Sequence, residues 1–285
     1  MEPDAAPDRR IPSRDLAGVV LAAGAGSRLA PLTDVLPKAL CPVGNRALVD
    51  LALDRLATVA GSMAVNAHHH ADLLVRHLER GWGSGVTVSV EHAEPLGTAG
   101  AIAALRDWID GRPVIVVNAD AWSPTSLEPL VREWDGSSAR VLIHGAGGFG
   151  PRASIVASVL PWSIASTLST RPSGLYEVVW RAAFERGELE VVVHDGPFID
   201  CGNPADYLRA NLTAVDLHGS SIIAPDADID DGVRIARSVI GPRARVRSDM
   251  VESVVWADQS VPAGGRLLRS IRAGSSVTVG PVESE

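Results

Sequence analysis

Two glycines, an arginine and a lysine near the start of the chain have the types and spacing to hold a phosphate group. An apolar run over residues 16–23 is followed by Gly24 and Gly26, and then by Arg28 and Lys38. Glycine has no Cβ to stand between the backbone and an anion, so successive N–H groups can approach phosphate oxygens closely. Arg28 would add a full positive charge. The pattern therefore predicts a loop that binds a phosphate-bearing ligand.

Two commoner phosphate loops fit these residues poorly. A Walker loop ends in Gly-Lys-Ser/Thr, and lysine follows neither Gly24 nor Gly26, which excludes that class. The dinucleotide fingerprint Gly-x-Gly-x-x-Gly finds its first two glycines, but Leu29 stands at the position of the third, so a dinucleotide site is disfavoured.

Lys38 is the only lysine of the chain, in which arginine supplies every other basic side chain apart from histidine. An ammonium group is a compact, strongly hydrated point charge that a planar guanidinium does not mimic. We therefore interpret Lys38 as a functional residue, with chance retention as the alternative.

A carboxylate follows a second apolar run. Residues 114–117 are continuously apolar, which is typical of a central strand in a parallel sheet, and Asp120 comes soon after them. Its side chain would lie at the carboxyl edge of the sheet, where α/β folds bind ligands. Asp120 is thus a candidate metal ligand. The alternative is a helix N-cap formed by Asp120 or Ser123.

Three segments resemble the sugar-1-phosphate nucleotidyltransferase family. The first is Leu-Ala-Ala-Gly-x-Gly-Ser-Arg-Leu-x-Pro-Leu-Thr over residues 21–33, followed by Pro-Lys-Ala-Leu-x-Pro-Val over residues 37–43. Pro-Leu-Gly-Thr-Ala-Gly over residues 95–100 looks like the family's second nucleotide loop. Residues 198–207 resemble its aromatic-x-Asp-x-Gly-Thr-Pro-x-Asp-Tyr element, with Asn203 in place of Thr. The chain looks most like the mannose-1-phosphate guanylyltransferase type.

The resemblance implies where the nucleotide and the metal bind. The implied nucleotide-binding residues are Leu21, Ala22, Ala23, Gly24, Gly26, Ser27, Arg28, Glu94, Gly97 and Thr98. Asp120 and Asp200 would hold Mg2+, which accepts one or two carboxylates and takes further oxygens from substrate phosphates. Gly97 would permit close approach to base and ribose. Glu91 or Glu94 would accept hydrogen bonds from guanine, which favours GTP.

The resemblance also implies the catalytic and sugar-phosphate groups. Arg28, Lys38 and Asp120 would be catalytic, and Lys38 and Asn118 would contact the sugar phosphate. Longer relatives carry a second lysine for that phosphate, and this chain has none. We expect Arg152 or Arg171 to replace it, because arginine binds phosphate bidentately. An ordinary surface position is the alternative for each.

The elements that must position these residues alternate between strand and helix. Helical periodicity covers residues 47–59 and 71–80, and strands are predicted over residues 63–67 and 86–90. Such alternation implies a mostly parallel, Rossmann-like sheet in an α/β domain, which we place over residues 16–217.

Aliphatic residues recur with a different spacing toward the C-terminus. Ile223, Ile229 and Ile235 stand six apart, while Ile240, Val255 and Ile271 are separated by 15 and then 16 residues. This spacing resembles a hexapeptide left-handed parallel β-helix, placed over residues 218–285, with packing, homo-oligomer contacts or regulation as its role. A loose β-meander is the alternative. The only histidine of this region is His218, so acyl transfer is not expected.

Composition limits the partners. A formal charge of −8 and a pI near 5.5 argue against a broad nucleic-acid surface. Cysteines 41 and 201 lack the spacing of a metal or redox pair and fit a reducing compartment, so we expect a cytoplasmic protein. No apolar run is long enough for a membrane span, and residues 1–15 have the composition of a disordered tail.

These expectations converge on Mg2+-dependent transfer of a nucleotidyl group from an NTP to a sugar 1-phosphate, with release of pyrophosphate. GTP and mannose 1-phosphate are the favoured pair. Uridylyl or thymidylyl transfer to another sugar or cyclitol phosphate is one alternative. A non-catalytic regulatory relative that binds an NDP-sugar is the other, and retention of Arg28, Lys38, Asp120 and Asp200 together argues against it.

Overall fold

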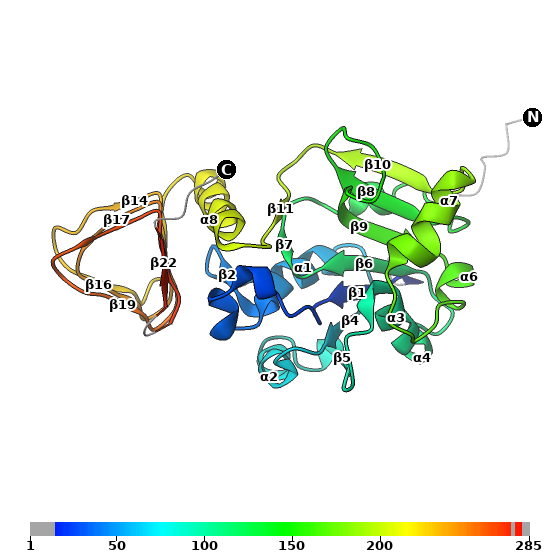
Figure 1. Cartoon of the computed structure of the whole chain (residues 1–285), viewed down its shortest axis with the longest axis horizontal. Helices are drawn as coiled ribbons and strands as arrows, with labels where there is room; N and C mark the ends of the chain where they lie inside the picture. The colour runs from blue at the N-terminus through cyan, green and yellow to red at the C-terminus, as the bar shows by residue number, and fades with distance from the viewer. Residues whose placement is uncertain (1–14, 275–276, 281–285) are drawn as a thin grey trace, which may run out of the picture.

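The computed structural model describes residues 15–274 and 277–280, so most of the predicted tail lies outside the described residues. An α/β domain is followed by a triangular coil of short strands (Figure 1). The seven-stranded sheet of the domain has the order β10-β8-β9-β6-β1-β4-β5. Its strands are β1 (Ala17–Leu21), β4 (Ser62–Ala67), β5 (Val86–Val90), β6 (Val114–Asn118), β8 (Arg140–His144), β9 (Ser154–Leu160) and β10 (Glu190–His194).

All neighbouring pairs in this sheet are parallel except those made by β9, which is antiparallel to both β6 and β8. The prediction of a mostly parallel sheet is therefore confirmed. Because β1 pairs in parallel with β4 on one side and β6 on the other, its carboxyl end lies between theirs. The phosphate loop thus emerges where a ligand of a parallel α/β sheet is expected.

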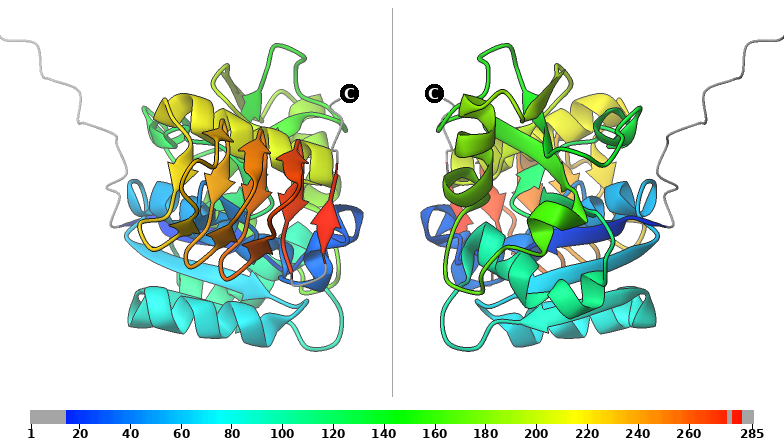
Figure 2. Two further views of the ribbon diagram at one scale, coloured as in Figure 1. Left: turned by 90° about the vertical axis from the view of Figure 1, so that its left-hand side faces the viewer. Right: turned by 90° about the vertical axis from the view of Figure 1, so that its right-hand side faces the viewer.

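Helices cover both faces of the sheet (Figure 2). They are α1 (Leu48–Ala57), α2 (Ala71–Gly81), α3 (Gly97–Ala104), α4 (Arg106–Ile109), α5 (Glu128–Val131), α6 (Trp162–Ala165) and α7 (Arg181–Glu185), with a π-helical segment η6 (Tyr176–Trp180) before α7. The predicted helices over residues 47–59 and 71–80 correspond to α1 and α2.

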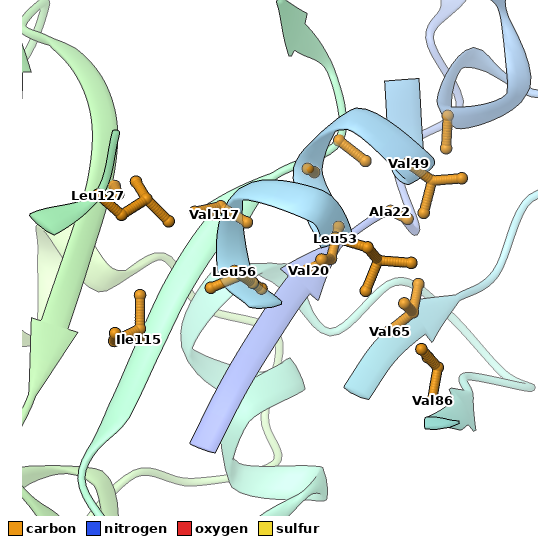
Figure 3. Close-up of a cluster of buried hydrophobic side chains, with 14 of the residues drawn as sticks. Val20, Ala22, Val49, Leu53, Leu56, Val65, Val86, Ile115, Val117 and Leu127 are labelled. Carbon is orange, nitrogen blue, oxygen red and sulfur yellow. The ribbon is translucent and has the colours of Figure 1, made fainter. Parts of the chain in front are cut away.

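Alternate residues of β1 belong to two different cores. Val20 packs with Leu53 and Leu56 of α1 on one face (Figure 3), and Val19 packs with Ile102 of α3 on the other. Val19 and Val20 are both fully buried. Burial on two faces explains why this strand reads as a continuous apolar run instead of an alternating one.

A short antiparallel pair lies beside the sheet and matters for the site. β7 (Ala121–Trp122) pairs with β11 (Ile199–Asp200), so that Asp200 lies opposite Ala121. The Cys201 N–H donates to the carbonyl oxygen of Asp120 at 3.0 Å. This pairing joins two segments that are distant in sequence. The helix-cap alternative for Asp120 is wrong, because a strand follows Asp120 directly.

The coil contains three short sheets whose successive members come from successive turns of the chain (Figure 2). The first sheet contains β12 (Ile222–Ile223), β15 (Val239–Ile240), β18 (Val254–Val255), β21 (Ile271–Arg272) and β22 (Thr278–Val279). The second contains β13 (Asp228–Ile229), β16 (Arg245–Val246) and β19 (Ser260–Val261). The third contains β14 (Ile235–Ala236), β17 (Asp249–Val251) and β20 (Arg266–Leu268). Pairing is parallel except at the last pair, β21 with β22. Parallel pairing is that of a β-helix and excludes the antiparallel meander.

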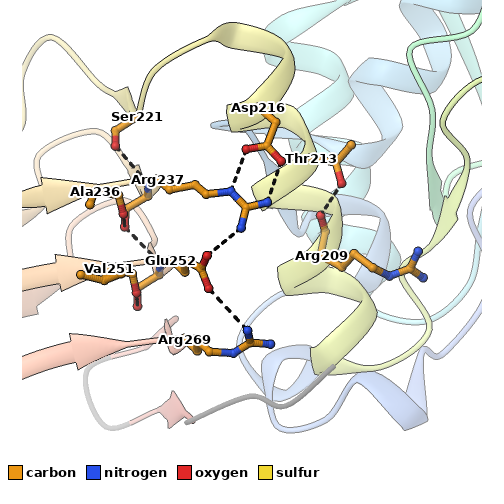
Figure 4. Close-up of polar contacts among 11 residues, drawn as sticks. Arg209, Thr213, Asp216, Ser221, Ala236, Arg237, Val251, Glu252 and Arg269 are labelled. Carbon is orange, nitrogen blue, oxygen red and sulfur yellow. Dashed lines mark hydrogen bonds and ion pairs between the residues drawn. The ribbon is translucent and has the colours of Figure 1, made fainter. Parts of the chain in front are cut away.

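Helix α8 (Pro204–His218) connects the two parts. Leu208 and Tyr207 of this helix share one apolar cluster with Val239 and Val254 of the coil. At the solvent edge, Arg237 pairs with Asp216 of α8 and with Glu252 of the next coil (Figure 4). These charges are 25–50% exposed, so the apolar cluster contributes most of the stabilisation. In the described part of the chain, no helix combines the length and apolarity needed to span a bilayer.

Candidate active site

A cavity of about 470 Å³ opens at the carboxyl ends of β1, β4 and β6. It is lined by Leu21, Ala22, Ala23, Gly24, Ala25, Gly26, Ser27, Arg28, Lys38, Ala39, Asn66, Pro95, Gly97, Thr98, Asn118, Ala119, Asp120 and Gly202. A larger hollow of about 660 Å³ lies at the amino ends of β8 and β10, away from Arg28 and Lys38. The first cavity is the candidate active site, because Arg28, Lys38, the Asp120 carboxylate and the glycine loop line it together.

The two glycines of the first loop have different roles. Nothing lies within 4 Å of the position that a Cβ would take at Gly24, so its backbone is open to the cavity. Gly26 has φ +63°, and a Cβ there would lie 2.9 Å from the Cβ of Lys38. Gly26 therefore shapes the turn that brings Lys38 beneath the loop, and Gly24 leaves room for an anion.

Lys38 joins the two carboxylates that the sequence analysis nominated. Its Nζ lies 3.2 Å from Asp120 Oδ2 and 3.3 Å from Asp200 Oδ1. The Lys38 side chain is 8% exposed, and those of Asp120 and Asp200 are 50% and 55% exposed. A buried cation is thus held beside two half-exposed carboxylates, of which Asp120 lines the cavity and Asp200 lies next to it. The pairing of β7 with β11 brings Asp200 to this point.

Arg28 lies on the same side. A Cβ at Gly202 would be 3.4 Å from Arg28 Nη2 and 3.3 Å from both carboxylate oxygens of Asp200. Gly202 therefore leaves the space in which the guanidinium and the carboxylate approach each other. Arg28 is itself exposed, so its charge is available to a ligand in the cavity.

The donor set suits one shared cation more than a closed metal centre. Within residues 15–274 and 277–280, no group of three or more His, Cys, Asp or Glu side chains converges to hold a metal. Asp120 and Asp200 already share the single charge of Lys38 Nζ. Two oxygen ligands with open positions match the way Mg2+ is bound together with substrate phosphates.

The cysteines next to this centre are not nucleophiles. Cys41 and Cys201 are both free and buried. Burial raises the pKa of the Cys41 thiol to about 12, in spite of the nearby charge of Lys38. Burial likewise raises the pKa of Cys201. Both thiols stay protonated at neutral pH and act as small core residues.

Gly97 makes a close approach to the protein backbone, and its approach to base and ribose stays a prediction. It begins α3 with φ +69°, and a Cβ there would lie 2.5 Å from the carbonyl oxygen of Ser173. The Ser173 carbonyl accepts from Ala99 N, and Thr98 Oγ1 accepts from Leu175 N. Gly97 lines the cavity, but its missing Cβ makes room for the backbone of the 173–175 segment.

Glu91 is buried and bonded within the fold. It is 6% exposed, and its two carboxylate oxygens accept hydrogen bonds from Asn66 Nδ2 at 2.7 Å and from Leu96 N at 2.8 Å. The expectation that Glu91 or Glu94 contacts guanine stays a prediction, and Glu91 could do so only from a buried position outside the residues that line the cavity. Glu94 is exposed and is not among the residues that line the cavity.

The sequence analysis missed Asn66. This residue ends the apolar part of β4, lines the cavity and accepts a hydrogen bond from Ala22 N at 2.7 Å. A polar residue near the carboxyl end of a buried strand was the available signal. Arg152 and Arg171 are exposed and do not line the cavity, so their contact with a sugar phosphate stays a prediction.

Comparison with known proteins agrees with this geometry. Residues 17–147 match the family model described as nucleotidyl transferase. The chain is 36% identical over 126 residues to N-acetylmuramate alpha-1-phosphate uridylyltransferase of Caulobacter vibrioides, a match covering 41% of this chain and 52% of that protein. It is 26% identical to mannose-1-phosphate guanyltransferase of Schizosaccharomyces pombe, over 73% of this chain and 67% of that protein. The match to the first of these spans about half of the relative's length.

A solved structure shares the fold. A protein from Bacillus anthracis assigned as glucose-1-phosphate thymidylyltransferase and crystallised with sucrose superposes with a TM-score of 0.56. The match has 21% identity and covers 70% of this chain and 96% of that one. At this identity the likeness concerns the fold alone.

Proposed function

Because residues 17–147 match the nucleotidyl transferase family model, we propose that the chain transfers a nucleotidyl group from an NTP to a sugar 1-phosphate and releases pyrophosphate. The observation that carries the proposal is Lys38 Nζ within 3.3 Å of both Asp120 and Asp200, with Lys38, Asp120 and the glycine loop lining one cavity. Three charged groups from separate segments meet there where phosphates would bind.

The reaction needs positioning more than activation. A sugar 1-phosphate is already anionic at neutral pH, so no histidine base or serine nucleophile has to generate the attacking oxygen. The phosphate oxygen attacks the α-phosphorus in line with the departing pyrophosphate, and negative charge on that group must be offset. In this proposal, Arg28 and the open backbone at Gly24 would hold the triphosphate. Lys38 would offset charge at the reacting phosphate.

Asp120 and Asp200 would hold Mg2+ in this proposal, because one cation already lies within reach of both carboxylates. When bound, the ion would neutralise phosphate charge and fix the geometry of the NTP. With both carboxylates engaged in this way, Lys38 Nζ would turn toward the ligand. Asn118 would contact the sugar phosphate, as would Arg152 or Arg171 if the 145–153 or 169–174 segment moves on binding.

Fewer contacts bear on the base than on the phosphates. The expectation of GTP rests on Glu91 or Glu94, and Glu91 is engaged in the fold. The relatives in comparison include a uridylyltransferase and several guanyltransferases. We propose GTP with mannose 1-phosphate as the first pair to test and UTP with an amino-sugar 1-phosphate as the second.

The test is pyrophosphate release with Mg2+, each of ATP, CTP, GTP, UTP and dTTP, and a panel of sugar 1-phosphates. Release that requires one NTP and one sugar phosphate supports the proposal and names the substrates. Asp120→Asn should abolish it, while Asp107→Asn, a carboxylate on α4 outside the cavity, should not. NDP-sugar binding without turnover across the panel would instead favour the regulatory relative.

We also propose that the coil is a left-handed hexapeptide β-helix and that it mediates homo-oligomer contacts. Its parallel sheets and its repeat spacing support the first part. Light scattering of the purified chain, compared with a variant truncated after α8, tests the second. A monomeric full-length chain would refute it.

A further inference from the structure

A buried pair of side chains connects the two loops of the candidate site. Asn66 Oδ1 accepts from Ala22 N in the first loop at 2.7 Å, and Asn66 Nδ2 donates to Glu91 Oε1 at 2.7 Å. Glu91 Oε2 accepts from Leu96 N, next to Gly97 of the second loop, at 2.8 Å. The two side chains are 3% and 6% exposed. An unbroken chain of three hydrogen bonds therefore runs from one loop to the other.

The neighbouring strands explain why these two residues meet. β4 and β5 are adjacent and parallel, with Ala67 opposite Val90, so Asn66 and Glu91 come from the same end of the sheet (Figure 1). The Glu91 N–H also donates to the carbonyl oxygen of Ala67 at 2.8 Å, which fixes where its side chain starts. The strands thus set the two side chains at hydrogen-bonding distance.

The three hydrogen bonds require a particular order of donors and acceptors. Both ends are backbone N–H donors, from Ala22 and Leu96, so the pair must present an acceptor at each end. It also needs one donor and one acceptor where its members meet. Asparagine with glutamate meets all three requirements, because an amide has one acceptor and one donor group while a carboxylate only accepts. A buried donor that has no acceptor destabilises the structure. The order of donors and acceptors along the three bonds therefore determines whether both loops keep their positions.

We propose that Asn66 and Glu91 are positioning residues that fix the spacing of the two nucleotide loops and so determine affinity for the NTP. The proposal rests on the function proposed above. Glu91 acts through Asn66 and Leu96 and does not line the cavity. Its role is therefore to hold the loops apart at the width of the nucleotide, not to take part in chemistry.

Three variants test the polarity requirement. In Glu91→Gln, two side-chain amides must satisfy each other and the N–H groups of Ala22 and Leu96. Whichever way the two amides are turned, one N–H group then faces another N–H group. In Asn66→Asp, two carboxylates face each other. In the double variant N66D/E91Q, the carboxylate introduced on β4 would accept from Ala22 N and from the amide introduced after β5, whose oxygen would accept from Leu96 N. All three bonds and the net charge are then restored.

The decisive readout is the sign of the Glu91→Gln effect in the two backgrounds. We expect Glu91→Gln to weaken NTP binding by about tenfold in the natural chain and to strengthen it when added to Asn66→Asp, as measured by calorimetry at pH 8. The single variant Asn66→Asp and the double variant both carry the additional carboxylate near the phosphates. The effect of that charge on NTP binding therefore cancels when these two chains are compared. An effect of the same sign in both backgrounds would overturn the proposal.

A second set of measurements separates positioning from a structural role. Urea unfolding of the four chains should show the same reversal of sign, and the KM for the NTP should follow it with little change in kcat. If the effect of Glu91→Gln on the free energy of unfolding changes sign between the two backgrounds but NTP affinity stays the same, the two residues have only a structural role. That result would overturn the proposal. Asn211→Asp is the matched control, because Asn211 is fully buried between Gly44 and Tyr207. It should lower stability and leave NTP affinity unchanged.

Failure of the proposed function is distinguishable from failure of this inference. Absence of turnover by the natural chain across the substrate panel would refute the transfer reaction. NTP binding by the four chains does not require turnover and would still test the two positioning residues.

Discussion

Lys38 Nζ lies 3.3 Å from Asp200 Oδ1, although 162 residues separate the two side chains along the sequence. The same Nζ lies 3.2 Å from Asp120 Oδ2. The single lysine of the chain is therefore the cation shared by the two candidate metal carboxylates. Its substitution should affect both catalysis and the response to Mg2+.

We expect Lys38→Met to lower the rate of pyrophosphate release on the order of 10²–10³-fold, because a full charge next to the reacting phosphate is lost. Loss of this cation also leaves Asp120 and Asp200 without their shared partner. Mg2+ should then raise the melting temperature more in the variant than in the natural chain. Arg76→Met removes an exposed ion pair with Asp72 and serves as the control. A variant with natural turnover would contradict the assignment.

Gly97→Ala and Gly24→Ala should fail in different ways. Gly97 has positive φ and would place a Cβ 2.5 Å from Ser173 O, so alanine there should lower the free energy of unfolding by about 1–3 kcal/mol. Gly24 has open space around it, so alanine should leave the unfolding midpoint unchanged and weaken NTP binding. Urea unfolding and calorimetry measure the two effects. Equal destabilisation by both substitutions would refute the distinction.

Tyr207→Phe should weaken the junction between α8 and the coil. The Tyr207 hydroxyl is fully buried, donates to the carbonyl oxygen of Pro42 and accepts from Trp256 Nε1 at 2.9 Å. Phenylalanine leaves both partners unpaired, at a cost of about 1–3 kcal/mol. The other tyrosine provides the control: Tyr176→Phe keeps the ring beside Phe149 and should change stability by less than about 0.5 kcal/mol. Similar denaturant midpoints for the two variants would contradict the prediction.

Stability should fall as the pH is lowered through about 6.5, in part because of His194. Burial lowers the pKa of His194, and the neighbouring His144 and Arg55 lower it further, while Asp195 opposes them. The unfolded chain therefore takes up a proton that the folded chain does not, and the free energy of unfolding decreases below the unfolded pKa. In the folded chain, the ring Nε2 of His194 is hydrogen-bonded to Thr125 Oγ1.

His194→Gln removes this titration and keeps an N–H that can reach Thr125. The loss of stability between about pH 7.5 and about pH 5.5 should therefore be smaller in the variant than in the natural chain. Carboxylates with lowered pKa, such as Asp50, titrate below this window and do not interfere. Identical pH dependence in both chains would show that His194 is not responsible.

The sequence by itself determined the elements whose periodicity is local. The apolar runs of β1 and β6, the amphipathic periods of α1 and α2 and the six-residue recurrence of the coil follow from how often a side chain must face a core. The glycine loop and Lys38 were found in the same way, because small residues and a lone lysine stand out within a few positions. Asp120 was placed by the strand that precedes it.

Only the tertiary structure decided which distant side chains meet. Asp200 reaches Lys38 because β11 pairs with β7, and Glu91 is withdrawn from the cavity because β5 lies beside β4. The missing side chain of Gly97 makes room for the backbone at Ser173, which lies 76 residues further along the chain. Such contacts depend on strand order and on competition among hydrogen-bond partners. The spacing of residues along one segment determines neither strand order nor this competition. A sequence pattern can therefore identify candidate side chains but cannot show which of them remain free to bind a ligand.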